Sequence, residues 1–181
     1  MQQDLEKARQ LMKEAGYDGR PVVLMDPTDI PILHAATLVT HQLLTKIGVK
    51  VDLQAMDWST LVSRRAEKKK PEEGGWNLFH TWWIAVDVFN PAVNVGVDGT
   101  CGKAWFGWYC SKQIEQLRAE WARTTDMAKR KHLATEIQKV AFDEVPYVPW
   151  GQWFLPVAYR DYVKGVLQFP APILWNIWLE K

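Results

Sequence analysis

The chain has 181 residues, of which 48% are hydrophobic and 24% are charged. This composition is typical of a globular protein, and it excludes a disordered chain and a disulfide-dense miniprotein. The 22 basic and 21 acidic residues almost cancel, which disfavours nucleic acid and anionic membranes as partners. Tryptophan is unusually frequent, at 11 residues, and usually serves core packing or a binding surface.

The N-terminal part of the chain predicts alternating helices and strands. A first helix begins after the capping residue Asp4 and ends at Gly16. A short buried strand follows at residues 21–25, and a turn at residues 26–29. A second helix is ended by Gly48. Its apolar stripe consists of Ile32, Ala36, Val39, Leu43 and Ile47.

The next elements complete β-α-β units. Residues 49–56 alternate in polarity, which predicts a strand with one exposed face. Asp57 caps a predicted helix that continues to about residue 69, and residues 77–83 return as a strand. Because the connections are short, right-handed crossovers and parallel pairing are expected. The sequence therefore predicts an α/β fold with a central sheet and flanking helices.

The C-terminal half has a different rhythm. Residues 84–110 contain four glycines and little periodicity, which predicts a long ordered loop of the kind that often carries function. Residues 111–124 and 126–145 predict two helices. The second has Leu133, Ile137, Val140 and Ala141 on one side. Two aromatic, β-prone stretches follow at residues 147–160 and 173–180.

The sequence contains no signature of catalysis or of a bound cofactor. It has no GxSxG, HExxH, P-loop or GxGxxG motif, so neither an enzyme nor a cofactor is predicted. His34 and His41 lie seven residues apart, whereas metal ligands on a helix are usually three or four apart, so no metal site is predicted. An amide hydrolase that uses Asp87, His80 and an unidentified serine is the enzymatic alternative.

Cys101 and Cys110 bracket an aromatic loop of eight residues. Their spacing permits a disulfide, which would stabilise the fold by about 2 to 3 kcal/mol by restricting the unfolded chain. A bridge would indicate an oxidising compartment. The alternative is a pair of free, buried thiols in a cytosolic protein.

Asp87 follows a predicted strand that ends with Trp82 and Trp83. Its carboxylate is therefore expected where the carboxyl edge of the sheet opens into a loop, the usual ligand site of open α/β sheets. There it can hold a ligand ammonium, since a charge pair about 4 Å apart is worth roughly 4 kcal/mol before desolvation at an effective dielectric near 20. The alternative is a turn-capping aspartate beside core tryptophans.

Six segments, taken in order, resemble the C-terminal portion of the extracellular solute-binding proteins of the dipeptide and oligopeptide class, which deliver solutes to ABC importers. They are DLEKARQLMKEAGYDG, VKVDLQAMDWSTL, WNLFHTWWIAVDVFNP, FGWYCSKQIEQLRAEW, RKHLATEIQKVAFDEVPYVPWGQ and PVAYRDYVKG. The resemblance covers essentially the whole chain, and the order of the segments is more specific than any one of them.

The resemblance implies a lobe of the type II periplasmic-binding-protein class, with a central mixed sheet. Proteins of this class are much longer and close two lobes over the ligand without a chemical step. The chain is therefore expected to be most of the C-terminal lobe, residues 1–164, started artificially at Met1, with residues 165–181 returning to the absent N-terminal lobe. The implied partners are a peptide or small-molecule ligand and a membrane permease. The implied location is the periplasm or cell surface, with the signal peptide outside this fragment.

The resemblance also implies a ligand site. Family members that bind peptides carry an aspartate, four residues before a proline, that pairs with the ligand's amino group, and Asp87 lies four residues before Pro91. Asn90 replaces a frequent acidic residue, and Trp83 lies one residue farther from Asp87 than is usual. These departures leave a cationic or aromatic non-peptide solute as the alternative ligand. The expected ligand contacts are Asp87, Trp82, Trp83, Asn90, Trp105, Trp108 and Tyr109.

A disulfide near Cys101 and Cys110 occurs in some members of the class, which favours the bridge. It would hold Trp105, Trp108 and Tyr109 as a rigid aromatic wall near the cleft. Without the other lobe, the segment 165–181 lacks its sheet partner and can pack on its own lobe, pair with a neighbouring molecule or fray. We expect self-association through this segment.

Overall fold

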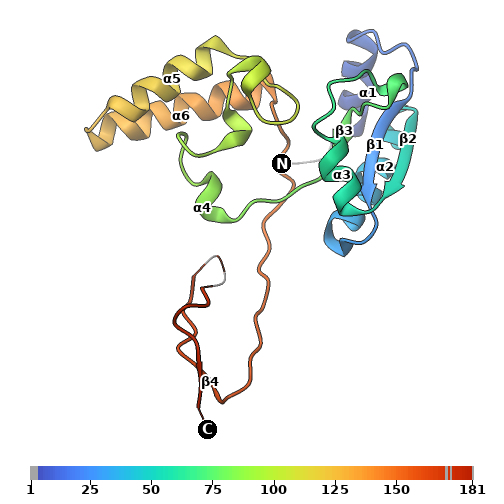
Figure 1. Cartoon of the computed structure of the whole chain (residues 1–181). Helices are drawn as coiled ribbons and strands as arrows, with labels where there is room; N and C mark the ends of the chain where they lie inside the picture. Colours follow the sequence, from blue (N-terminus) through green and yellow to red (C-terminus); the bar gives the residue numbers. More distant parts are fainter. Residues whose placement is uncertain (1–3, 170, 172, 181) are drawn as a thin grey trace. The chain divides into compact units, whose positions relative to one another are not determined.

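The computed structural model describes residues 4–169, 171 and 173–180 of the chain. The chain folds into two compact units, Met1–Trp82 and Trp83–Lys181 (Figure 1). The expected division at residue 164 falls within the second unit and stays a prediction. In the described part, no helix is both long enough and apolar enough to cross a membrane.

A three-stranded parallel sheet forms the centre of the first unit. Its strands are β1 (Val22–Pro27), β2 (Val51–Met56) and β3 (Leu78–Phe79), in the order β2-β1-β3. The middle strand β1 is buried from Val23 to Pro27 because it has a neighbour on each side. The predicted parallel β-α-β units are confirmed.

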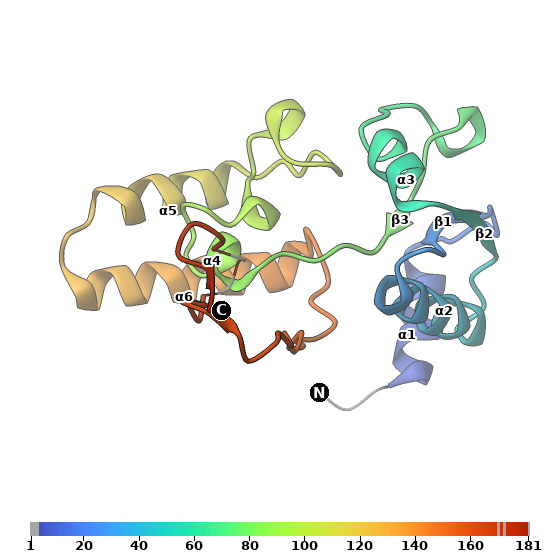
Figure 2. The same cartoon turned by 60° about the horizontal axis from the view of Figure 1, so that its bottom comes forward.

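Helices cover both faces of this sheet. They are α1 (Leu5–Glu14), α2 (Pro31–Lys46) and α3 (Trp58–Arg64), and Figure 2 shows α1 and α2 on one face and α3 on the other. This arrangement follows from the strand order, because the crossover from β1 to β2 and the crossover from β2 to β3 run in opposite directions and both are expected to be right-handed. The caps predicted for α1 and α3 are confirmed, since the side chains of Asp4 and Asp57 accept hydrogen bonds from the first turns of these helices.

The turn predicted at residues 26–29 was wrong at its start, because β1 continues through Asp26 to Pro27. Asp26 is only 2% exposed. The ring of His34 lies beside it, with Nδ1 2.9 Å from each carboxylate oxygen. This pairing lets a carboxylate occupy a buried strand position.

The buried face of α2 also differs from the predicted apolar stripe. Leu33 and Thr37 are fully buried, whereas Val39 is 57% exposed. Thr37 tolerates burial because its hydroxyl donates a hydrogen bond to the Leu33 carbonyl, at 2.8 Å. A threonine that satisfies its own hydroxyl is a core residue that a hydrophobicity pattern does not detect.

The helix α3 ends at Arg64, earlier than predicted, because the chain folds back on it. The Arg64 guanidinium donates hydrogen bonds to the carbonyls of Gly74 and Gly75, at 2.9 and 2.7 Å. A side chain at Gly75 would lie 2.0 Å from the Lys69 carbonyl oxygen, so this close approach requires glycine. A short 3₁₀ turn, η1 (Pro71–Glu73), lies within this loop, and the predicted strand 77–83 is reduced to β3.

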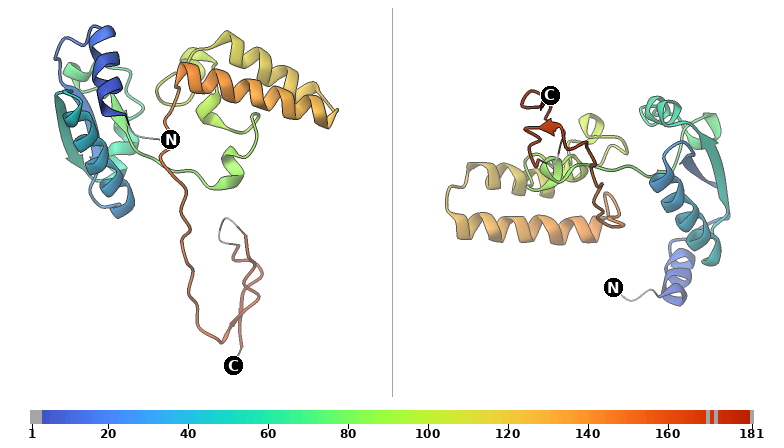
Figure 3. Two further views of the ribbon diagram at one scale, coloured as in Figure 1. Left: turned by 180° about the vertical axis from the view of Figure 1, so that it is seen from behind. Right: turned by 90° about the horizontal axis from the view of Figure 1, so that it is seen from below.

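The second unit is organised by a helical hairpin of α5 (Lys112–Arg123) and α6 (Met127–Glu144), which lie side by side (Figure 3). Ser111 and Asp126 cap these helices through their side chains, as the predicted starts imply. The core consists of Val97, Ile114 and Ile137, with Val140 and Ala141 packed against it. The predicted core side of α6 is therefore confirmed.

The predicted long loop, residues 84–110, is ordered by three short helical turns. They are α4 (Ala85–Val88), η2 (Val95–Val97) and η3 (Cys101–Lys103). Val97, in η2, reaches the core of the hairpin. The loop is thus tied to α5 and α6 through packing.

The C-terminal segment forms a small antiparallel ribbon of β4 (Val163–Lys164) and β5 (Trp178–Leu179). The β-prone stretch at residues 147–160 contains no described strand. In this ribbon, Val163 and Lys164, before the expected boundary, pair with Leu179 and Trp178, which follow it. The central sheet is therefore parallel, not mixed as expected, because the antiparallel pair of the described residues lies in this separate ribbon. The expected α/β class is confirmed.

Candidate ligand-binding site

A row of aromatic rings occupies the second unit. The ring centroids of Trp83 and Trp105 lie 4.9 Å apart, and those of Trp83 and Tyr147 lie 6.3 Å apart in an edge-to-face arrangement. Phe106 extends the row, at 5.0 Å from Trp105. The row combines residues from before α4, from the loop before α5 and from beyond α6. Trp83 and Trp105 were predicted as ligand contacts, whereas Tyr147 was not.

The disulfide between Cys101 and Cys110 closes the loop that carries Trp105. Backbone hydrogen bonds reinforce the closure, including the bond from the Cys101 N–H to the Tyr109 carbonyl, at 2.9 Å. Trp108 adopts a left-handed backbone conformation, with φ of 50°, and its N–H bonds to the Trp105 carbonyl. The predicted bridge is confirmed, and it holds Trp105 in a short, internally bonded loop.

Tyr109 is anchored to the end of α6. Its hydroxyl donates a hydrogen bond to Glu144, whose other carboxylate oxygen accepts one from Ser111, at 3.2 Å. Burial and the bond to Glu144 raise the pKa of Tyr109 to about 12. The ring also packs against the core of the hairpin. Tyr109 therefore fixes the aromatic loop to α6, and ligand contact by Trp108 and Tyr109 stays a prediction.

Asp87 and Asn90 lie on or just after α4, and the structure gives them different surroundings. The side chain of Asp87 is exposed. The side-chain oxygen of Asn90 accepts hydrogen bonds from the N–H groups of Ala92 and Val93, at 2.9 and 3.3 Å. The turn-capping role that was the alternative for Asp87 is thus performed by Asn90, and the carboxylate of Asp87 faces solvent.

Arg118, on α5, holds the segment that follows Asn90. Its Nε donates to the Pro91 carbonyl at 2.9 Å, and its Nη1 lies 3.5 Å from Asp98 and close to Glu115. Glu115 in turn accepts a hydrogen bond from the Gly99 N–H, at 2.9 Å. With a side chain only 15% exposed, Arg118 ties both ends of the segment to α5. The spacing of Glu115 and Arg118 predicts a helical ion pair, but nothing in the sequence indicates their contacts with the loop.

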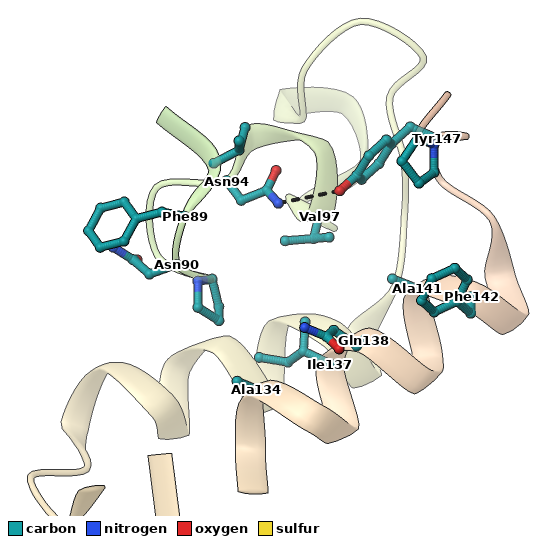
Figure 4. A pocket seen from close by; sticks show the side chains of 13 residues that line it. Phe89, Asn90, Asn94, Val97, Ala134, Ile137, Gln138, Ala141, Phe142 and Tyr147 are labelled. Atoms are coloured by element: carbon teal, nitrogen blue, oxygen red, sulfur yellow. Dashed lines mark hydrogen bonds between the residues drawn. The ribbon is translucent and has the colours of Figure 1, made fainter. Parts of the chain in front are cut away.

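A cavity of about 260 Å³ lies between this segment and α6 (Figure 4). Asn90, Asn94 and Val97 line it from the segment, and Ile137 and Gln138 line it from α6. Tyr147 closes one end, where its hydroxyl lies 3.5 Å from the side-chain nitrogen of Asn94. The cavity therefore shares Tyr147 with the aromatic row.

Trp82, the remaining predicted contact, belongs to the first unit. Its ring stacks on Trp58, with centroids 5.1 Å apart and planes inclined by 20°. The guanidinium of Arg65 lies 5.6 Å from the centre of the Trp58 ring, in a cation–π arrangement. The structure thus associates Trp82 with Trp58, and its role in ligand binding stays a prediction.

The first unit also contains a polar cluster at the carboxyl end of β1 and β3. His80 is hydrogen-bonded to Thr40, with 2.9 Å between Nε2 and Oγ1. Burial lowers the pKa of His80, although the nearby Asp26 carboxylate acts in the opposite direction. Within the described residues, no group of three or more His, Cys, Asp or Glu side chains is arranged to hold a metal ion.

Residues 2–103 match the family model described as bacterial extracellular solute-binding proteins, family 5 Middle. The chain belongs to this family. A probable peptide ABC transporter periplasmic-binding protein of Sinorhizobium fredii is 38% identical over 174 residues, which cover 96% of this chain and 33% of that protein. A glutathione-binding protein of Salmonella typhimurium is 29% identical over 81% of this chain and 29% of its own length. This family 5 chain thus spans about a third of the relatives that it matches.

Solved structures show the same fold. The OppA protein of Burkholderia pseudomallei matches 98% of this family 5 chain with a TM-score of 0.70 and 20% identity, over 35% of its own chain. The periplasmic binding protein DppA of Helicobacter pylori, solved with the peptide STSA, gives a TM-score of 0.66 and 20% identity, over the same shares of the two chains. The expected type II periplasmic-binding-protein fold is therefore confirmed.

Proposed function

We propose that this chain is the ligand-binding C-terminal lobe of a substrate-binding protein, which captures a peptide or similar small solute between two lobes. The bound solute is then delivered to the membrane permease of an ABC importer, without a chemical step. The observation that carries the proposal is membership of family 5 together with 38% identity to a protein named as a peptide-binding component. Residues 165–181 would then return to the other lobe.

The second unit supplies suitable chemistry for this role. Asp87 offers an exposed carboxylate for a ligand ammonium, and Trp83, Trp105 and Tyr147 form a row of preordered rings. Preordered aromatic groups provide contact area at a small entropic cost. The disulfide supports a location in the periplasm or at the cell surface, because such bonds persist in oxidising compartments.

Native mass spectrometry of the protein, purified gently from its own cells, tests the proposal. We expect a co-purifying peptide or amine that is released intact, without hydrolysis products. Replacing Asp87 with alanine should remove the bound mass, whereas the same change at Asp161, an exposed aspartate of the C-terminal segment, should not.

Three results would contradict parts of this proposal. A bound mass that survives Asp87→Ala removes this carboxylate from the site. A bound cationic or aromatic solute that is not a peptide would favour the alternative ligand class, which the departures at Asn90 and Trp83 from the family pattern suggested. Turnover of a peptide panel, lost in Asp87→Asn, would instead support an amide hydrolase.

A further inference from the structure

The disulfide of the aromatic loop, residues 101–110, joins two cysteines that differ in their exposure. Cys110 is exposed to solvent, whereas Cys101 is partly buried. The Sγ atom of Cys101 lies 3.7 Å from the carbonyl oxygen of Gly99. Because a thiolate attacks a disulfide at the sulfur that it can reach, the side chain of Cys110 is the expected point of attack.

The aromatic loop holds backbone conformations that its residues seldom adopt. Cys101 and Trp108 have φ angles of 62° and 50°, in the left-handed region that is uncommon outside glycine. Such conformations persist only where the surrounding structure imposes them. The disulfide contributes to this constraint, because it ties Cys101 to the far end of the loop. Without the covalent bond, both residues are expected to return toward ordinary backbone conformations.

The end of the loop that leads into α5 has anchors other than the disulfide. The hydroxyls of Tyr109 and Ser111 donate hydrogen bonds to Glu144, and the Tyr109 ring packs against the core of the helical hairpin. The Ser111 N–H donates to the Gly99 carbonyl, at 3.1 Å. Cleavage of the disulfide is therefore expected to leave α5 and α6 folded and to loosen the tip of the loop, residues 102–108.

The tip of the loop carries Trp105, whose ring lies against Trp83 in the aromatic row. Two backbone hydrogen bonds shape this tip. The Ala104 N–H donates to the Cys101 carbonyl at 2.9 Å, and the Trp108 N–H donates to the Trp105 carbonyl at 2.8 Å. Each bond includes one of the two left-handed residues, so a change of backbone conformation at Cys101 and Trp108 breaks both. The position of Trp105 against Trp83 therefore depends on the closed loop.

We propose that Cys110 is a thiol–disulfide exchange site for a dithiol reductant, and that reduction of the bridge releases Trp105 from Trp83. The oxidised loop presents a preordered ring to the aromatic row, whereas the reduced loop does not. The chain thus carries a reversible change in its aromatic surface that follows the redox state of its surroundings. This change is separate from solute capture and occurs whether or not the row contacts a solute.

The exchange proceeds in two steps. A thiolate of the reductant forms a bond to the Cys110 sulfur, the bond between the two protein sulfurs breaks, and its electron pair leaves on Cys101, which takes a proton from water. The second thiolate of the reductant then attacks the reductant's own sulfur in the mixed disulfide, and Cys110 leaves as a thiolate that is protonated in turn. Two electrons pass to the protein, and the dithiol becomes a disulfide.

Trapping of the first step identifies the sulfur that is attacked. The folded 181-residue chain is exposed briefly to the monothiol 2-mercaptoethanol, treated with iodoacetamide and mapped by peptide mass spectrometry. We expect the mercaptoethanol adduct on Cys110 and the carbamidomethyl group on Cys101. An equal or reversed distribution, or a bridge that reacts only after the chain is unfolded with denaturant, would overturn the exchange site.

Nuclear magnetic resonance of the ¹⁵N-labelled chain, before and after reduction with dithiothreitol, tests the release of the ring. The indole N–H signals are assigned with Trp83→Phe, Trp105→Phe and Trp121→Phe. We expect the signals of Trp83 and Trp105 to shift on reduction. The signal of Trp121, which packs against the core of the hairpin from α5, is the control and should stay.

The double variant Cys101→Ser and Cys110→Ser should show the reduced positions without dithiothreitol, and the reduced wild-type chain gives the same test if this variant does not fold. Unchanged signals of Trp83 and Trp105 in the reduced chain would overturn the release, as would loss of the Trp121 signal through unfolding of the hairpin. Because both experiments need no solute, their failure is distinguishable from an empty protein in the native mass measurement.

Discussion

At the scale of single residues, the aromatic loop depends on polar contacts as well as on its disulfide. The hydroxyls of Tyr109 and Ser111 both donate to Glu144, the last residue of α6. Burial of the phenol and its hydrogen bond to the Glu144 carboxylate make it harder to remove the proton of Tyr109. The contact between loop and helix is therefore sensitive to alkaline pH.

Tyr109 should make the protein less stable at high pH. Its folded pKa of about 12 lies above the ordinary value of 10.0, so the unfolded chain loses this proton first as pH rises. The contribution to stability is complete below pH 10 and is lost between pH 10 and 12. Denaturant unfolding at a series of pH values measures this loss, and Tyr109→Phe should reduce it.

An ultraviolet titration provides an independent check of the same group. The chain has five tyrosines, and one phenolate transition near pH 12 should disappear in Tyr109→Phe. The variant Tyr159→Phe, which alters an exposed tyrosine of the C-terminal segment, serves as the control. A wild-type titration that matches Tyr109→Phe throughout would contradict the raised pKa.

At the scale of elements, the segment after α4 acquires its shape from α5. Asn90 and Asp98 bond to backbone N–H groups within the segment, while Arg118 and Glu115 attach it to the helix. The three short helical turns of this segment pair with no strand, so their arrangement depends on these bonds to α5. The guanidinium supplies the connection because it has several donors in one plane.

Replacing Arg118 with alanine should loosen this segment. Loss of the guanidinium removes the Arg118 hydrogen bond to the Pro91 carbonyl and the ionic partner of Asp98 and Glu115, so we expect the free energy of unfolding to fall by about 1–3 kcal/mol. Hydrogen exchange should accelerate at Gly99, whose N–H bonds to Glu115, and in the neighbouring loop. Arg123→Ala, in the exposed last turn of α5, is the matched control. Unchanged exchange at Gly99 in Arg118→Ala would show that the segment does not depend on this clamp.

At the scale of the whole chain, apolar side chains accumulate near the C-terminus. Leu174, Trp175, Trp178 and Leu179 are between 57% and 85% exposed, and the ribbon of β4 and β5 leaves them uncovered. Exposed apolar surface of this kind often marks a contact with another protein surface. This exposed surface supports the expected self-association of the chain through residues 165–181.

We predict concentration-dependent oligomers of the 181-residue chain in size-exclusion chromatography and small-angle scattering. The double substitution Trp175→Ser and Trp178→Ser should shift the equilibrium toward the monomer by removing the largest exposed rings. Phe154→Ser, at an exposed position outside residues 165–181, is the control. A monomer at every concentration, with the tail ordered on its own unit, would contradict this prediction.

The sequence by itself determined the features that depend on local chemistry. The capping residues Asp4, Asp57, Ser111 and Asp126 were legible because a short polar side chain bonds to N–H groups two or three residues ahead. Alternating polarity and short connections gave the parallel sheet. The spacing of Cys101 and Cys110 permitted the bridge, and the order of the motifs placed the chain among solute-binding proteins.

Only the tertiary structure decided the contacts between residues far apart in the chain. Tyr147 joined Trp83 in the aromatic row, Arg118 gripped the loop, and Thr37 replaced Val39 in the core. Such contacts arise when packing brings together side chains from distant parts of the chain. The local sequence around each side chain does not indicate which residue it will contact. The cavity has the same origin, because its two walls belong to segments some 40 residues apart, from Asn94 to Ala134. Local propensity selects the elements, whereas the burial of their faces selects which side chains meet.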